Sequence, residues 1–209
     1  PDTIAAISGD PLAGPVNYTG ERHSLDDVRL LAPVIPRSKI VGVGKNYADH
    51  AKEMGGEVPE SPLLFFKPNT SVIGPDDTII RPAGCENLHF EGEMAIVIGR
   101  ICKEVPAERV PEGIFGYTIW VNTHLTVEEA EHLTIETRLG DEVRQQGSTA
   151  QMVRGIVELV THITSFTTLL PGDLILTGTP AGVGSMEPGD RVSVEIDGLG
   201  VLSNPVADA

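Results

Sequence analysis

Two glutamates separated by one glycine, Glu91 and Glu93, precede an apolar run at residues 94–98. Side chains alternate between the faces of a strand, so an extended backbone would direct both carboxylates to one side, about 7 Å apart. Two carboxylates in a partly buried site repel each other unless one is protonated or a cation lies between them. A hard divalent ion such as Mg²⁺ would satisfy the pair. The spacing alone, however, favours a solvated edge strand.

A second pair with chemical potential is His50 and Glu53, in the segment HAKE. Positions i and i+3 adjoin on a helix, so the carboxylate could orient the imidazole and help it to draw a proton from water. An exposed helix with no catalytic role is the alternative, because this spacing is weak evidence by itself. His89 would share the face of Glu91 and Glu93. Mg²⁺ rarely takes imidazole, which favours a solvated histidine or one outside the ligand set.

The third candidate is the glycine-rich segment TGTPAGVG at residues 177–184, which follows an apolar stretch. Its backbone N–H groups and the hydroxyls of Thr177 and Thr179 could hold a substrate carboxylate. It lacks the G-x-x-x-x-G-K-[ST] pattern, so a phosphate-binding loop is not supported. A strained turn without a ligand is an equally open interpretation.

The composition limits the classes of function. The chain has 209 residues, a net charge of −15, 40% hydrophobic residues and only 4% aromatic residues, which predicts an aliphatic core. The acidic balance argues against nucleic-acid binding, which needs a basic surface. No window approaches 18 uninterrupted apolar residues, so we expect no membrane span. Cys85 and Cys102 form no disulfide framework, and reduced thiols in a cytoplasmic protein are the simpler interpretation.

The elements that must position these residues are mostly short strands. Strands are expected at 38–44, 62–68, 87–99, 115–119 and 174–180, hairpins at 134–146 and 190–206, and helices at 46–54 and 126–133. The clearest helix is expected from the capping-box pair Ser148 and Gln151 through Phe166, because apolar residues there recur at helical spacing. Residues 1–32 are expected to form a small N-terminal region. Together these features predict a β-dominated α+β protein rather than a doubly wound sheet.

The order of the motifs is more specific than any one of them. VGVGKNYADHAKEM, LFFKPNTSVIGP, FEGEMAIVIGR, GYTI, LLPGDLILTGTPAGVG and a closing G-x-G-x-L-x-NPV occur in that order. This series resembles the fumarylacetoacetate hydrolase family over residues 33–206. The resemblance implies a mixed β-roll or β-sandwich-like barrel, a homodimer, and a small N-terminal appendage before a catalytic domain at residues 33–209.

The resemblance also implies roles for individual residues. Glu91 and Glu93 match the family's E-x-E pair, which binds Mg²⁺ or Mn²⁺ together with a downstream aspartate. His50 and Glu53 match its catalytic dyad. Thr179 matches a substrate-contacting position, and Lys67 matches the lysine of a K-P step near the site.

The sequence departs from the family pattern after GYT. The family continues with N-D-V-T-x-R-D-like and R-x-K-G-x-D-like segments, which supply the third metal carboxylate and a catalytic lysine. Here Ile119 is followed directly by Trp120, and about thirty residues of the pattern have no counterpart. A natural deletion would cripple the site, whereas a sequence joined across a disordered loop would keep matching flanks. Because both flanks match, we predict that Ile119 and Trp120 are not bonded; a Cα–Cα distance of about 3.8 Å would contradict this.

The implied function is a metal-dependent hydrolase that cleaves a carbon–carbon bond in a 2-oxo acid, such as an acylpyruvate or fumarylpyruvate, through a metal-stabilised enolate. Such an enzyme would belong to the catabolism of aromatic compounds. The same scaffold could serve a 2-hydroxyhepta-2,4-diene-1,7-dioate isomerase or an oxaloacetate-type decarboxylase. A module that binds oxo acids without turnover is the non-enzymatic alternative. The expected partners are a small 2-oxo acid or dicarboxylate and a second copy of the chain, with no nucleic acid and no membrane.

Overall fold

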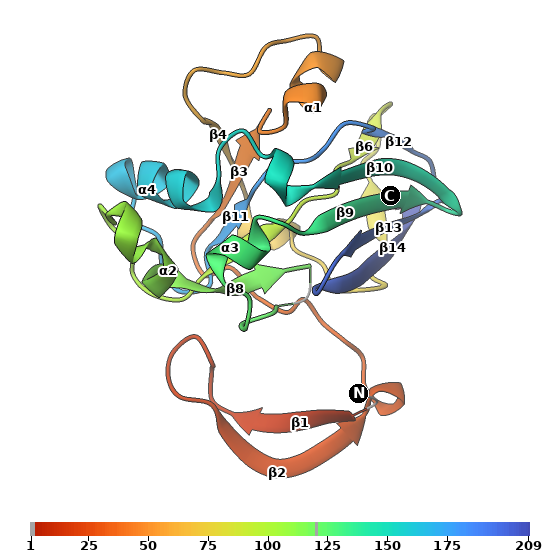
Figure 1. The fold of residues 1–209 in the computed structure, drawn as a ribbon. Coiled ribbons are helices and arrows are strands. Elements are labelled where there is room, and N and C mark those ends of the chain that lie inside the picture. Colours follow the sequence, from red (N-terminus) through yellow and green to blue (C-terminus); the bar gives the residue numbers. More distant parts are fainter. Residues whose placement is uncertain (1–2, 120) are drawn as a thin grey trace.

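A computed structural model describes residues 3–119 and 121–209 of the chain (Figure 1). Most of these residues form a body of two five-stranded sheets and a small two-stranded sheet, while a separate hairpin lies to one side of it. The junction between Ile119 and Trp120 falls outside the described residues, so the prediction about that bond stays a prediction.

The first five-stranded sheet has the strand order β4-β3-β11-β7-β8. Its strands are β3 (Ile40–Gly44), β4 (Leu63–Lys67), β7 (Ala95–Ile98), β8 (Ile114–Thr118) and β11 (Leu174–Leu176). The central strand β11 runs parallel to β3 and antiparallel to β7. All four residues of β7 are buried, as expected for an aliphatic strand covered on both faces.

The second five-stranded sheet has the order β10-β9-β13-β14-β5. Its strands are β5 (Ile79–Arg81), β9 (Thr134–Leu139), β10 (Glu142–Ser148), β13 (Arg191–Ile196) and β14 (Gly200–Asp208). The two expected hairpins are present here, as the β9–β10 and β13–β14 pairs. Strands β6 (Leu88–Phe90) and β12 (Gly184–Met186) pair with each other, and β1 (Thr3–Ser8) and β2 (Asn17–Ser24) form the N-terminal hairpin.

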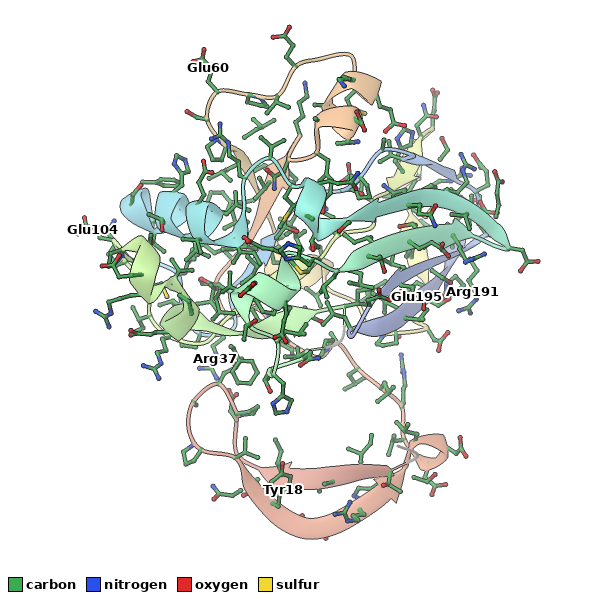
Figure 2. The ribbon with its side chains drawn as sticks, viewed as in Figure 1. Tyr18, Arg37, Glu60, Glu104, Arg191 and Glu195 are labelled. Atoms are coloured by element: carbon green, nitrogen blue, oxygen red, sulfur yellow. The ribbon has the colours of Figure 1, made fainter. Side chains whose placement is uncertain are left out.

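Helices are few and short. The α-helices are α1 (Ala48–Glu53), α2 (Val110–Gly113), α3 (Val127–Ala130) and α4 (Ile156–Phe166), and the 3₁₀ turns are Leu25–Asp27, Asn69–Ser71, Ala107–Arg109 and Thr149–Gln151. The α4 helix buries Ile156, Leu159, Val160 and Ile163 in the largest apolar cluster, which also contains Ile96 of β7. The core is largely aliphatic, as the composition predicts. Charged side chains such as Glu60, Glu104, Arg191 and Glu195 lie at the periphery (Figure 2).

The expected strand at 87–99 is wrong in one respect, because it is two strands that belong to different sheets. Residues 91–94 lie between β6 and β7 and take part in no ladder. The Gly92 N–H donates to Gln145 Oε1 at 2.9 Å, and the Gly92 carbonyl accepts from Thr179 Oγ1 at 2.8 Å. Side chains thus satisfy the backbone groups that a continuous strand would have paired.

The longest helix begins later than expected. Ser148 and Gln151 do form a capping box, but it closes the 3₁₀ turn Thr149–Gln151, and α4 starts after Gly155. Between them the backbone bonds to Asn46, whose carbonyl accepts from the Val153 N–H and whose Oδ1 accepts from the Arg154 N–H. A contact more than a hundred residues away in sequence therefore overrides a local helix signal.

The predicted class is confirmed: the protein is a β-dominated α+β fold with few helices. Within residues 3–119 and 121–209, no helix combines the length and apolar character that crossing a membrane requires. The division into residues 1–32 and 33–209 stays a prediction.

Candidate active site

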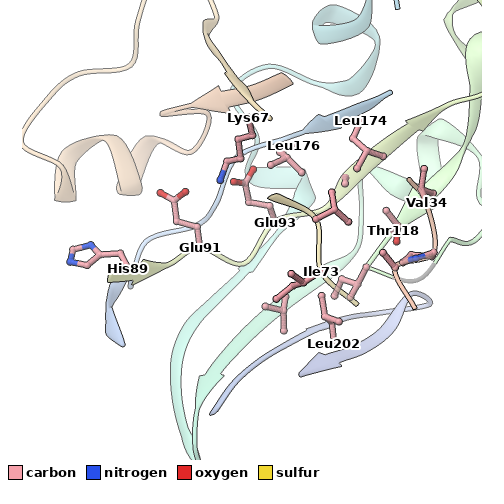
Figure 3. A pocket seen from close by; sticks show the side chains of 16 residues that line it. Val34, Lys67, Ile73, His89, Glu91, Glu93, Thr118, Leu174, Leu176 and Leu202 are labelled. Carbon is pink, nitrogen blue, oxygen red and sulfur yellow. The ribbon is translucent and has the colours of Figure 1, made fainter. Parts of the chain in front are cut away.

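A cavity of about 330 Å³ opens beside the Glu91–Gly92–Glu93 segment (Figure 3). Its polar end contains Lys67 from β4, His89 from β6, Glu91 and Glu93. The rest of its wall is mainly apolar and comes from both large sheets and from the segments before β3 and after β4. This part includes Val34, Ile73, Leu174, Leu176, Val194 and Leu202. Both glutamates line one cavity, as expected, but strand alternation is not the reason, because residues 91–94 belong to no strand.

The two glutamates differ in environment. The Glu91 side chain is 40% exposed, whereas Glu93 lies deeper and its Oε2 accepts the Gly178 N–H at 2.6 Å. Burial and then the charge of Glu91 raise the pKa of Glu93 to about 7, against the opposing effects of the Gly178 bond and of Lys67. A neighbouring positive charge would relieve this cost, so the pair favours a cation between the two carboxylates.

The histidine and glutamate of α1 contact each other as their spacing predicts. His50 Nδ1 lies 3.3 Å from Glu53 Oε2, and His50 is buried while the Glu53 carboxylate is partly exposed. The other ring nitrogen, His50 Nε2, lies 3.9 Å from Glu91 Oε1. A proton on Nδ1 that is directed at Glu53 leaves Nε2 as the basic nitrogen, beside the acidic pair.

Backbone amides of the glycine-rich loop, residues 177–184, contact both acidic groups. The Gly178 N–H bonds to Glu93, and the Gly182 N–H donates to both carboxylate oxygens of Glu53, at 3.0 and 3.2 Å. Gly182 has φ +104°, and the carbonyl of Arg144 lies where a side chain would begin. Glycine is therefore required at this position, because any Cβ would clash with the backbone of β10. The loop amides thus bind carboxylates of the protein itself, and the binding of a substrate carboxylate by this loop stays a prediction.

The two threonines of the loop use their hydroxyls within the protein. Thr177 Oγ1 donates to the Met94 carbonyl at 2.9 Å, and Thr179 Oγ1 donates to the Gly92 carbonyl. Both residues are buried, and neither lines the cavity. The substrate contact assigned to Thr179 stays a prediction, while the structure shows this hydroxyl tying the loop to the acidic segment.

Gln145 is a residue of the site that the motifs did not single out. It is fully buried on β10; its Oε1 accepts the Gly92 N–H, and its Nε2 donates to Thr179 Oγ1 and to the Pro180 carbonyl, both at 2.7 Å. One feature of the sequence could have identified Gln145: it is an amide side chain within a predicted hairpin strand, and a polar group that faces inward from a strand requires hydrogen-bond partners.

A divalent cation fits the oxygen-rich end of the cavity. Glu91 and Glu93 would hold it, and water or substrate oxygens would complete the shell, as Mg²⁺ and Mn²⁺ commonly require. No group of three or more His, Cys, Asp or Glu side chains is arranged as a metal site in the part of the chain that the structure describes. The described site therefore supplies a pair of carboxylates rather than a complete cage.

Comparison with known families gives a consistent result. The family model described as fumarylacetoacetate (FAA) hydrolase C-terminal matches residues 39–123 and 119–207 of the sequence. A second family model, described as Rv2993c-like, N-terminal, matches residues 1–33. The two FAA hydrolase matches meet at residues 119–123, next to the interruption of the motif series. The protein Rv2993c of Mycobacterium tuberculosis is 44% identical over 234 residues, covering 98% of this chain and 88% of the relative. The oxaloacetate tautomerase YisK of Bacillus subtilis is 35% identical over 225 residues, covering 88% and 75%.

Solved structures are similar over nearly the whole chain. The 2-hydroxyhepta-2,4-diene-1,7-dioate isomerase of Mycobacterium marinum has a TM-score of 0.88 and 39% identity, covering 99% of this chain and 88% of that chain. The maleylpyruvate hydrolase of Sphingobium sp. SYK-6, in complex with manganese(II) and pyruvate, has a TM-score of 0.80 and 30% identity, covering 90% and 77%.

Proposed function

This chain belongs to the fumarylacetoacetate hydrolase family, and its relatives include enzymes such as an oxaloacetate tautomerase and a maleylpyruvate hydrolase. We propose that it hydrolyses a carbon–carbon bond in a 2-oxo acid of the acylpyruvate class. The observation that carries the proposal is the meeting of His50 with Glu53 on one side and Glu91 on the other. A base for water and a pair of carboxylates suited to a divalent cation thus lie within one site.

The dyad would activate water. Glu53 is held by the Gly182 amide and faces His50 Nδ1, which sets the imidazole so that Nε2 can take a proton. The hydroxide adds to the distal carbonyl carbon of the acylpyruvate, and the bond from that carbon to the methylene group then breaks. The electron pair leaves with the pyruvate half as its enolate, which takes a proton at the methylene carbon. The products are a carboxylic acid and pyruvate, and the one water consumed balances the reaction.

Binding of the 2-oxo acid end would use the polar end of the cavity. Lys67 lies there beside Glu93 and could pair with the substrate carboxylate. Mg²⁺ or Mn²⁺ held by Glu91 and Glu93 would supply Lewis-acid stabilisation of the negative charge that develops on the 2-oxo oxygen. The manganese and pyruvate in the maleylpyruvate hydrolase structure support this class of cation and this class of ligand.

The second candidate is isomerisation or tautomerisation of a 2-oxo diacid, or decarboxylation of an oxaloacetate-like acid. The isomerase and tautomerase among the relatives favour it. These reactions need no attacking water, so His50 would at most move protons.

The test is a panel of substrates assayed with Mg²⁺, with Mn²⁺ and with a chelator. The activities of wild type and His50→Ala are compared on an acylpyruvate, oxaloacetate and a hydroxy-dienedioate. His132→Ala, at an exposed residue of the turn that follows α3, serves as a control. We expect loss of at least about 100-fold in acylpyruvate hydrolysis for His50→Ala, as for the removal of a general base. Full hydrolytic turnover by His50→Ala would refute the dyad, and binding of all three acids without turnover would favour the non-enzymatic module.

We infer that the protein is a cytoplasmic homodimer. Both cysteines, Cys85 and Cys102, are free thiols, which fits a reducing compartment. The side chains of Leu63 and Phe66 on the edge strand β4 are 48% and 63% exposed, which supports a contact with a second copy of the chain at this edge. Sedimentation of the purified chain tests the dimer, and a monomer at micromolar concentration would contradict it.

A further inference from the structure

The buried amide of Gln145 lies between the two segments that carry the acidic groups of the site. On one side it holds the segment between β6 and β7, through the Gly92 N–H. On the other it holds the glycine-rich loop, through Thr179 Oγ1 and the Pro180 carbonyl. Thr179 completes a closed set of hydrogen bonds by donating to the Gly92 carbonyl at 2.8 Å.

This set of hydrogen bonds holds the loop whose amides bind two carboxylates, those of Glu93 and Glu53. The loop that Gln145 holds donates its Gly178 amide to Glu93 and its Gly182 amide to Glu53. Glu53 in turn contacts His50. A shift of the loop would therefore move a proposed cation ligand and the partner of the proposed base together.

The backbone around Gln145 leaves little room for adjustment. Thr137 Oγ1 occupies the place that a side chain on Gly92 would need, so the acidic segment lies directly on β9. The Arg144 carbonyl similarly occupies the place of a Cβ on Gly182. Adjacent residues of β10 thus contact the loop at two points, one through a side chain and one through the backbone.

We propose that Gln145 is a positioning residue that couples Glu93 and the His50–Glu53 pair through the glycine-rich loop. The proposal rests on the proposed function for the meaning of those carboxylates, but its structural content does not depend on turnover. In this view Thr179 works with Gln145 to hold the acidic segment in place. Partners of metal ligands typically change metal affinity by 10–100-fold when they are removed.

The matched variants lie next to each other on β10. Gln145→Met keeps the length of the side chain and removes all three hydrogen bonds, whereas Gln146→Met changes an exposed neighbour that points to the opposite face. A second pair, Thr179→Val and Thr179→Ser, removes or keeps one hydroxyl. It tests the Gln145–Thr179 and Thr179–Gly92 bonds of the same set if Gln145→Met does not fold.

The first measurement is amide hydrogen exchange in the metal-free protein. We expect at least tenfold faster exchange at Gly178 and Gly182 in Gln145→Met and Thr179→Val, with less than twofold change in Gln146→Met and Thr179→Ser. Amides of α4 and β7 should keep wild-type rates. Unchanged exchange at both glycines overturns the proposal, and so does a uniform increase that includes α4 and β7, because that pattern reports general destabilisation.

The second measurement is Mn²⁺ affinity by calorimetry, without substrate. We expect Kd to rise about 10–100-fold in Gln145→Met and to stay within twofold in Gln146→Met. Equal affinity in Gln145→Met and wild type would overturn the coupling to Glu93. If the wild type binds no Mn²⁺, the proposed metal site fails, whereas the exchange data still decide whether Gln145 positions the loop.

Discussion

Two carboxylates lie near opposite ends of the short central strand β11, and their surroundings shift their pKa values in opposite directions. Asp173 immediately precedes the strand, and Glu93 is bonded to Gly178 just beyond it. Asp173 is fully buried and Glu93 is half-buried at the cavity, and the pKa of Asp173 is held below its usual range while that of Glu93 is raised to about 7. The difference lies in the number and kind of partners that each one has.

Asp173 is saturated with donors. Burial alone would raise its pKa, but Lys39 Nζ at 2.7 Å, Ser38 Oγ at 2.7 Å, and the backbone amides of Lys39 and Leu170 lower it further than burial raises it. Such a carboxylate stabilises the fold because its charge is fully compensated.

Glu93 has one backbone donor, a second carboxylate as its neighbour, and Lys67 nearby, whose charge offsets only part of the effect of burial and of Glu91. The fold therefore leaves negative charge incompletely compensated at this end of the strand. Perturbed carboxylates that face a cavity are typical of functional sites rather than of structural ones. Asp173 is thus a carboxylate that stabilises the structure, whereas Glu93 is one that a cation could neutralise.

The largest effect on stability is expected from Asp173→Asn. The substitution leaves Lys39 without its counter-ion and replaces one of the two acceptor oxygens by an NH₂ group that faces other donors, which should cost about 3 kcal/mol in the free energy of unfolding. A folded pKa below the unfolded value gives stability that is present above the unfolded pKa and lost as pH falls through the folded one. Urea denaturation should therefore show the gap between wild type and variant closing as the pH is lowered towards that range. A gap that persists unchanged in acid would contradict the assignment.

Glu93→Gln should act in the opposite direction. In chelator, the wild-type carboxylate has a folded pKa of about 7, above its unfolded value, so its contribution is favourable in acid and is lost as pH rises through about 7. We expect the variant to be more stable than wild type by about 3 kcal/mol at pH 8, since a shift of one pKa unit corresponds to about 1.4 kcal/mol, and equal to it below about pH 4. With saturating Mn²⁺ the order should reverse, because only the intact pair gains stability from the cation. Thermal unfolding with and without Mn²⁺ measures both results.

Lys39→Met is expected to have the smallest effect. Asp173 keeps Ser38 and its backbone donors, so the loss should be about 1 kcal/mol, or about 2–4 °C in Tm. Lys52→Met is the control, since the Lys52–Asp49 pair is about three-quarters exposed at each side chain and should contribute little. Equal Tm shifts in the two variants would show that Lys39 has no special role at Asp173.

Local rules predicted much of the fold. The apolar segments that became β3, β4, β8 and β11 and the two hairpins of the second sheet were recognisable from their own residues. The break between β6 and β7 and the late start of α4 were not. Both depend on partners far away in sequence, Gln145 and Thr179 in one case and Asn46 in the other.

The candidate site divides in the same way. The sequence by itself determined that His50 meets Glu53, because the helical i, i+3 spacing is a property of a few consecutive residues. Strand alternation also predicted that Glu91 and Glu93 share one side, but in the structure they line one cavity from a segment that belongs to no strand. The tertiary structure alone decided that His50 Nε2 lies 3.9 Å from Glu91, and that Gly178, Gly182 and Gln145 hold the acidic groups. These contacts depend on which strands pair and in what register. Pairing is a balance over whole sheets, and no short stretch of residues encodes it.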